Sequence, residues 1–138
     1  MRIDFYVSQQ NQPQARLVLA CQLARRSWLA NMPCWINCLD EPQQQQLDQM
    51  LWDIRSEMFM PHDLVQDNAQ APIVIALDET PVQNGSVVIN LTNNIINPVA
   101  QTARIIELVC QEPALLEQSR HNYSQYRKLG FQPQRVEL

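Results

Sequence analysis

The order of apolar segments in the first half of the chain is the feature that most limits its fold. Ile3–Val7 has the alternation of a strand, and residues 13–30 carry an apolar stripe at helical spacing. The short apolar run Cys34–Cys38 predicts a second strand. Asp40-Glu41-Pro42 signals the start of a second helix over residues 41–54, in which Gln43–Gln46 is interpreted as a solvated turn. Strands that alternate with helices favour a mostly parallel sheet covered by helices. We therefore expect an α/β fold, a single-domain Rossmann-like three-layer sandwich.

The second half of the chain predicts fewer helices. Residues 55–71 are expected to form an irregular connection, whereas Pro72–Leu77 and Ser86–Leu91 have the composition of buried strands. Residues 103–110 fit either a helix, by their spacing, or a strand, by their β-branched side chains. Pro113–Leu129 predicts a last helix, ended by Gly130 as the residue after the C-cap.

The chain lacks the glycines that nucleotide binding on such a fold requires. The turn between the first strand and the first helix, Ser8–Pro13, contains no glycine, and the whole chain contains two. A Rossmann dinucleotide site uses a glycine-rich turn there, so that the backbone can approach the pyrophosphate. We therefore expect no nucleotide-binding loop and no cofactor. His62 is interpreted as a structural hydrogen-bonding residue and His121 as exposed, so the chain is not expected to be an enzyme by itself.

The cysteines are interpreted as core residues. No export signal and no long apolar run is present, which predicts a cytoplasmic protein with reduced thiols and no membrane contact. Cys34 and Cys38 lie on one side of a predicted strand together with Ile36, and their spacing is wrong for a zinc knuckle. No metal site is expected.

Charge is unevenly distributed along the chain, whose net charge is −4. Residues 40–79 hold nine of the fourteen acidic residues and one base, Arg55, whereas residues 118–135 hold four bases and no acid. The acidic total argues against a duplex-DNA-binding protein. The two segments are either solvated faces of opposite charge or two binding surfaces, of which the basic one suits an acidic partner.

Two predicted helices carry side chains that their own core stripes do not explain. Trp52 points away from the apolar stripe of residues 41–54, so either the following loop covers it or it contacts a partner, since Trp is frequent in interfaces. On the last helix, a mixed apolar and cationic stripe runs beside the predicted core stripe of Leu115, Tyr126 and Leu129. The mixed stripe consists of Leu116, Arg120, Tyr123 and Arg127. It fits either an ordinary solvated face or a site for a short acidic peptide with an apolar end.

At these positions the sequence resembles a known family, the chi subunit of bacterial DNA polymerase III. The resemblance covers nearly the whole chain and is specific in three blocks. They are Leu47-Asp48-x-x-Leu51-Trp52 with Phe59-x-Pro61-His62-x-Leu64, then Val88-Ile89-Asn90-Leu91, and Arg120-x-x-Tyr123-x-x-Tyr126-Arg127-x-x-Gly130-Phe131. The resemblance implies a Rossmann-like fold without nucleotide binding, and it implies that Arg104–Val109 is a strand.

The resemblance also implies partners and sites. Family members bind the psi subunit of the clamp loader and the acidic C-terminal tail of single-stranded-DNA-binding protein, which ends in Phe, so they meet DNA mainly through other proteins. By position, the tail site would consist of Val109, Arg120, Tyr123, Arg127 and Gly130. Trp52 and Phe59 would belong to the surface used for psi, and for a helicase in some bacteria. Ser124 stands where some members carry Lys, which removes one cation from the tail site.

The expected function is therefore that of a non-catalytic accessory subunit in DNA replication. Two other classes remain open at this point. The basic last helix with its tyrosines could stack the bases of single-stranded nucleic acid. A small enzyme without its usual motif is the third class, which a bound nucleotide or metal in the purified protein would support.

Overall fold

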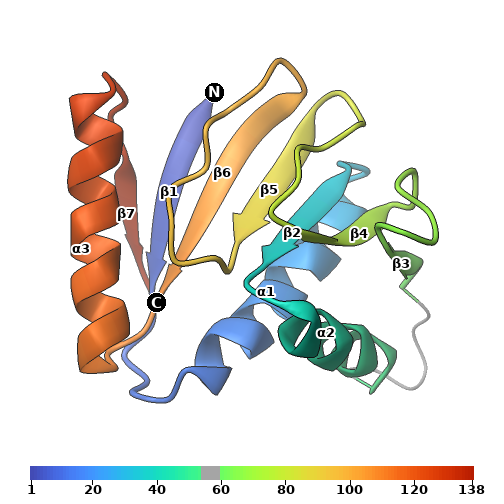
Figure 1. The fold of residues 1–138 in the computed structure, drawn as a ribbon, viewed down its shortest axis with the longest axis horizontal. Helices are drawn as coiled ribbons and strands as arrows, with labels where there is room; N and C mark the ends of the chain where they lie inside the picture. Colours follow the sequence, from blue (N-terminus) through green and yellow to red (C-terminus); the bar gives the residue numbers. More distant parts are fainter. Residues whose placement is uncertain (54–59) are drawn as a thin grey trace.

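The structure is a computed structural model that describes residues 1–53 and 60–138. Within these residues, seven strands form one sheet in the order β3-β4-β2-β5-β6-β1-β7, and every strand pairing is parallel (Figure 1). Along the chain the elements are β1 (Arg2–Val7), α1 (Gln14–Leu29), β2 (Cys34–Cys38), α2 (Glu41–Asp53), β3 (His62–Leu64), β4 (Ile73–Leu77), β5 (Ser86–Asn90), β6 (Thr102–Val109), α3 (Pro113–Lys128) and β7 (Gln134–Glu137).

The helices cover the two faces of the sheet unequally. Leu17 of α1 and Leu47 of α2 belong to the same core cluster as Ile36 and Ile106, on one face. On the other face, α3 contributes Tyr126 to a second cluster that includes Phe5. The predicted α/β sandwich with a parallel sheet is thereby confirmed. No helix among the described residues is long and apolar enough to cross a membrane.

Local side chains fix the ends of the helices. At the start of α2, Asp40 Oδ1 accepts a hydrogen bond from the Gln43 backbone N–H at 3.0 Å, and Gln43 Oε1 accepts one from Leu39 N–H at 2.7 Å. At the end of α3, Gly130 has φ 95°, a conformation that a residue without Cβ adopts at little cost. The Phe131 N–H reaches the Tyr126 carbonyl at 3.1 Å, which completes a Schellman motif. Gly130 therefore ends the helix as predicted.

The thiols lie in the core, as predicted. All four cysteines are buried, and Cys34 and Cys38 share a face of β2 with Ile36. Burial raises the pKa of Cys21, Cys34 and Cys38 to about 12. Thiols with such pKa values stay protonated near neutral pH and are poor nucleophiles.

Two short strands were not predicted. Residues 62–64, expected to be irregular, form β3 and pair with β4, while β7 pairs with β1 at the opposite edge of the sheet. Both are edge strands of three or four residues with partly exposed side chains. Such strands lack the apolar pattern that burial on both faces imposes on central strands of a parallel sheet.

Two side chains differ from their predicted environment. Leu129, predicted in the core stripe of the last helix, is 56% exposed because it is the C-cap, where the helix ends. Gln44, predicted in a solvated helical turn, is buried, and its amide donates a 2.9 Å hydrogen bond to the Ile75 carbonyl in β4. A glutamine at a core-facing helical position is tolerated because this hydrogen bond offsets part of its desolvation.

A buried carboxyl group joins the sheet to α3. Glu107 of β6 accepts hydrogen bonds at one oxygen from Asn90 Nδ2 and from the Tyr126 hydroxyl, both at 2.7 Å. Burial raises the pKa of Glu107 to about 7, although these hydrogen bonds and the charge of Arg16 act in the opposite direction. The folded protein therefore retains a proton on Glu107 in a pH range where an unfolded chain has lost it.

This difference predicts a pH dependence of stability. The folded pKa of about 7 lies above the ordinary value of 4.5, so the unfolding free energy should fall as pH rises between these values. Glu107→Gln keeps a neutral hydrogen-bonding side chain at every pH. Urea unfolding should show that, from about pH 5 to about pH 8, the wild type loses on the order of 2–3 kcal/mol more than this variant. Equal losses in the two proteins would contradict the prediction.

Candidate functional site

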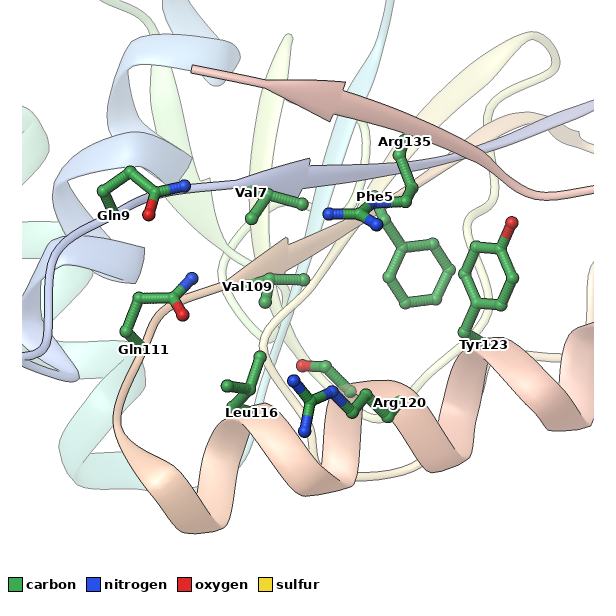
Figure 2. A pocket seen from close by; sticks show the side chains of 10 residues that line it. Phe5, Val7, Gln9, Val109, Gln111, Leu116, Arg120, Tyr123 and Arg135 are labelled. Carbon is green, nitrogen blue, oxygen red and sulfur yellow. The ribbon is translucent and has the colours of Figure 1, made fainter.

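A groove of about 650 Å³ runs between α3 and the face of the sheet that α3 covers, near the edge formed by β1 and β7. Figure 2 shows it with the sheet strands behind and α3 along one side. Its size is typical of sites that hold a small molecule or a few peptide residues. The lining residues are Phe5, Val7, Gln9, Val109, Gln111, Leu116, Ser119, Arg120, Tyr123 and Arg135.

Strand register produces the apolar floor of the groove. Val7 of β1 pairs with Val109 of β6, and both belong to the core cluster that faces α3. Phe5 lies two residues earlier in β1 and therefore on the same face. Leu116 of α3 packs against this cluster from the helix side. A single apolar side chain of a ligand can be buried here.

Tyr123 forms one end of the groove. Its ring meets the Phe5 ring edge-on, with centroids 5.1 Å apart and planes at 64°. Its hydroxyl donates a 3.1 Å hydrogen bond to the Pro133 carbonyl, in the segment that leads into β7. The ring is therefore held in place on two sides. At the other end, Gln9 and Gln111 follow β1 and β6 and present amide groups (Figure 2).

Cations stand on both sides of the groove. In Figure 2 the Arg135 side chain extends from β7 toward the groove, and the Arg120 side chain lies along α3 on the other side. Arg120 is exposed and makes no ion pair with any acid in the described part of the chain, whereas Arg135 pairs with Glu137 at 2.5 Å. Arginine can grip a carboxylate in bidentate fashion. The groove thus combines an apolar floor with cationic sides.

A shallower depression of about 380 Å³ adjoins the groove along α3. It is lined by Arg120, Tyr123, Ser124, Arg127 and Lys128. Since Arg120 and Tyr123 line both, a ligand several residues long can extend from one to the other.

The predicted tail-site residues divide between these two places. Val109, Arg120 and Tyr123 line the groove, and Arg127 lines the adjoining depression. Gly130 lines neither and instead ends α3.

The second predicted surface lies at the other end of the sheet, on α2. Trp52 is 50% exposed, and its ring meets the His62 ring edge-on with centroids 4.8 Å apart. His62 is buried and has Nδ1 2.8 Å from the Met60 carbonyl, consistent with the predicted structural role. Its Nε2 is 3.2 Å from Asp48 Oδ1 but outside hydrogen-bonding geometry. Phe59, predicted beside Trp52, lies outside the described residues.

Sequence reasoning missed the contribution of β7 to the groove. Arg135 was counted in the basic segment but assigned to no site, because β7 itself was not predicted. Arg135, Val136 and Glu137 do alternate between polar and apolar, and this alternation was the available signal. Phe5 and Val7 were predicted only as strand residues.

Fold and groove together define the class: an α/β sandwich protein with a basic, apolar-floored groove between its last helix and a sheet edge. A family model described as DNA polymerase III chi subunit, HolC, matches residues 1–134. Over 130 residues the chain is 39% identical to DNA polymerase III subunit chi of Pseudomonas aeruginosa. The aligned region covers 94% of this chain and 92% of that protein. The protein of the same name from Haemophilus influenzae is 30% identical, over 93% of this chain and 91% of its own length. The one from Escherichia coli is 28% identical, over 82% of this chain and 79% of its own length. The chain belongs to the DNA polymerase III chi-subunit family, whose members are accessory subunits in DNA replication.

The hydroxyl of Tyr123 should contribute to stability, and its ring should maintain the shape of the groove. Tyr123→Phe removes the hydrogen bond to Pro133 and should lower the unfolding free energy by about 1 kcal/mol. The ring contact with Phe5 should survive, so the groove should keep its shape. Urea unfolding checks the first part. The neighbouring exposed Ser124→Ala is the matched control, and a loss of the same size in that control would contradict the assignment.

Proposed function

We propose that this chain is a non-catalytic adaptor that links the clamp loader, through psi, to the C-terminal tail of single-stranded-DNA-binding protein. It acts as one chi-like domain, residues 1–138, at the replisome in the cytoplasm, and it contacts DNA mainly through its partners. Membership of the chi family supports this proposal. The tail is acidic and ends in Phe, so it offers an aromatic side chain beside a terminal carboxylate.

The observation that carries the proposal is the juxtaposition of Arg120 with an apolar floor. Val109 and Phe5 provide a surface for an aromatic ring, and the exposed Arg120 guanidinium stands at its margin without an acidic partner among the described side chains. A C-terminal Phe carries an aromatic ring and a carboxylate on one residue, so its site must offer an apolar surface and a cation close together. The remaining acidic residues of the tail would extend over Arg127 in the adjoining depression.

The layout of the sheet supports an adaptor with two partners. The groove lies at β1 and β7, one end of the strand order, and Trp52 lies on α2, which contacts β3 and β4 at the other end. A half-exposed Trp is a typical anchor of a protein interface. Two partners can therefore bind without competing for the same surface.

Direct binding of single-stranded nucleic acid is the alternative function. It would use the tyrosines of α3 as stacking platforms. Tyr126, however, is buried and donates its hydroxyl hydrogen to Glu107, and Tyr123 has its ring against Phe5. One tyrosine is thus withdrawn from solvent, which favours the adaptor proposal.

Titration of a fluorescent acidic peptide ending in Phe, followed by anisotropy, tests the groove. The wild type should bind saturably, and binding should weaken with salt because charge pairing contributes to it. The double substitution Arg120→Ala, Arg127→Ala should weaken binding about tenfold or more. The same peptide with an amidated C-terminus should also bind more weakly, since the terminal carboxylate is then absent.

The controls separate site loss from general charge loss. Arg26→Ala removes one positive charge from α1, on the opposite face of the sheet, and should leave peptide affinity unchanged. An oligonucleotide should not bind in the same buffer. Absence of peptide binding by the folded wild type would overturn the tail-site proposal, and oligonucleotide binding lost in the double variant would support the alternative.

The second surface predicts a complementary result. Trp52→Ala should weaken binding of purified psi about tenfold or more, since a truncated interface Trp typically costs at least 1–2 kcal/mol. The same variant should bind the acidic peptide as the wild type does. Isothermal titration calorimetry with each partner measures both. Unchanged affinity for psi would show that Trp52 does not belong to that interface.

A further inference from the structure

The edge strand β7 places two charged side chains on the face of the sheet that carries the groove. In the parallel pairing with β1, Arg135 stands beside Phe5 and Glu137 beside Val7. Because alternate residues of a strand share a face, Arg135 and Glu137 lie on the groove side. Val136, between them, packs into the core on the opposite side of the sheet, which fixes this orientation.

Arg135 and Glu137 form an ion pair with each other. Arg135 Nη2 lies 2.5 Å from Glu137 Oε1, and both side chains are more than half exposed, at 62% and 55%. Exposed ion pairs of this kind contribute little stability. The Arg135 guanidinium is therefore held near the groove by a partner that an incoming carboxylate can replace.

Resting on the proposed function, we propose that Arg135 is a second carboxylate-binding residue of the groove and that Glu137 competes with the bound peptide for it. In the free protein the Glu137 carboxylate pairs with the Arg135 guanidinium. An acidic peptide anchored by its apolar side chain on Phe5 and Val109 brings its own carboxylate close to Arg135. Glu137 is then released to solvent. Glu137 therefore lowers peptide affinity, because it competes with the peptide carboxylate for Arg135.

The arrangement of cations around the site supports this assignment. Arg120 lines the groove from α3 and Arg135 from β7, so an acidic ligand in the groove has a cation on each side (Figure 2).

Anisotropy titration of the acidic peptide ending in Phe, with single and double substitutions, tests the proposal. Arg135→Gln should weaken binding about three- to tenfold, and Glu137→Gln should strengthen it about two- to fivefold. In the Arg135→Gln background, Glu137→Gln should strengthen binding much less, because its competitor role needs Arg135. Arg26→Gln, on the opposite face, is the charge-matched control, and circular dichroism checks that every variant is folded.

The outcomes distinguish this inference from the function on which it rests. If Arg120→Ala weakens binding while the Arg135 and Glu137 variants match the wild type, the inference is wrong and the adaptor proposal stands. Equal effects of Glu137→Gln with and without Arg135 would reduce Glu137 to a general repulsive charge and overturn the competition. An Arg26→Gln loss equal to that of Arg135→Gln would also overturn it. If the folded wild type binds no peptide, both proposals fail.

Discussion

The groove depends on a buried hydrogen-bond junction at Glu107. One oxygen of this carboxyl group receives hydrogen bonds from Tyr126 on α3 and Asn90 on β5, and the same Tyr126 hydroxyl accepts the Ile96 N–H at 2.9 Å. Helix, sheet and the 91–101 connection are therefore joined at one point. Because the Tyr126 side chain points toward the sheet, the rotation of α3 about its own axis is fixed. That rotation places Tyr123 and Arg120, which lie three and six residues earlier, on the side of α3 that lines the groove. Because this junction lies inside the core, the Glu107 carboxyl is neutral at low pH. At high pH its charged form is buried, which lowers the stability of the folded protein.

The opposite side of the groove depends on register. Parallel pairing of β1 with β6 places Val7 beside Val109, and pairing with β7 places Arg135 beside Phe5. A slip of one residue in β7 would send Arg135 to the other face and Val136 into the groove. The Tyr123 hydroxyl bond to Pro133, just before β7, and the packing of Val136 both oppose such a slip. The chemistry of the groove is thus fixed by backbone pairing as much as by the side chains themselves.

Sequence reasoning succeeded where local chemistry or two-sided burial determines structure. The start of α2 after Asp40, the Gly130 helix end and the central apolar strands each follow from physical rules that act within a few residues. It failed where tertiary position decides. Leu129 has the periodicity of a core residue but stands where the helix ends, and Gln44 has the character of a surface residue but finds the Ile75 carbonyl. The edge strand that carries Arg135 has no apolar run, so the groove could be predicted from α3 alone and not from β7.

Under the proposed function, the separation of the two surfaces would allow a small domain with modest individual interactions to act as a tether. Arg120, Arg127 and Arg135 are exposed, so in the proposed adaptor an ion pair between each of them and an acidic peptide would be weak and reversible at physiological salt. A partner held at the Trp52 end would raise the effective concentration of a second partner joined to the groove, and avidity would then exceed either affinity without any new contact. Weak binding at the groove would also allow rapid release, because differences in affinity appear mostly in dissociation rates. The seven-stranded sheet separates the two surfaces, so the coupling between the proposed partners would be one of proximity and would require no conformational change.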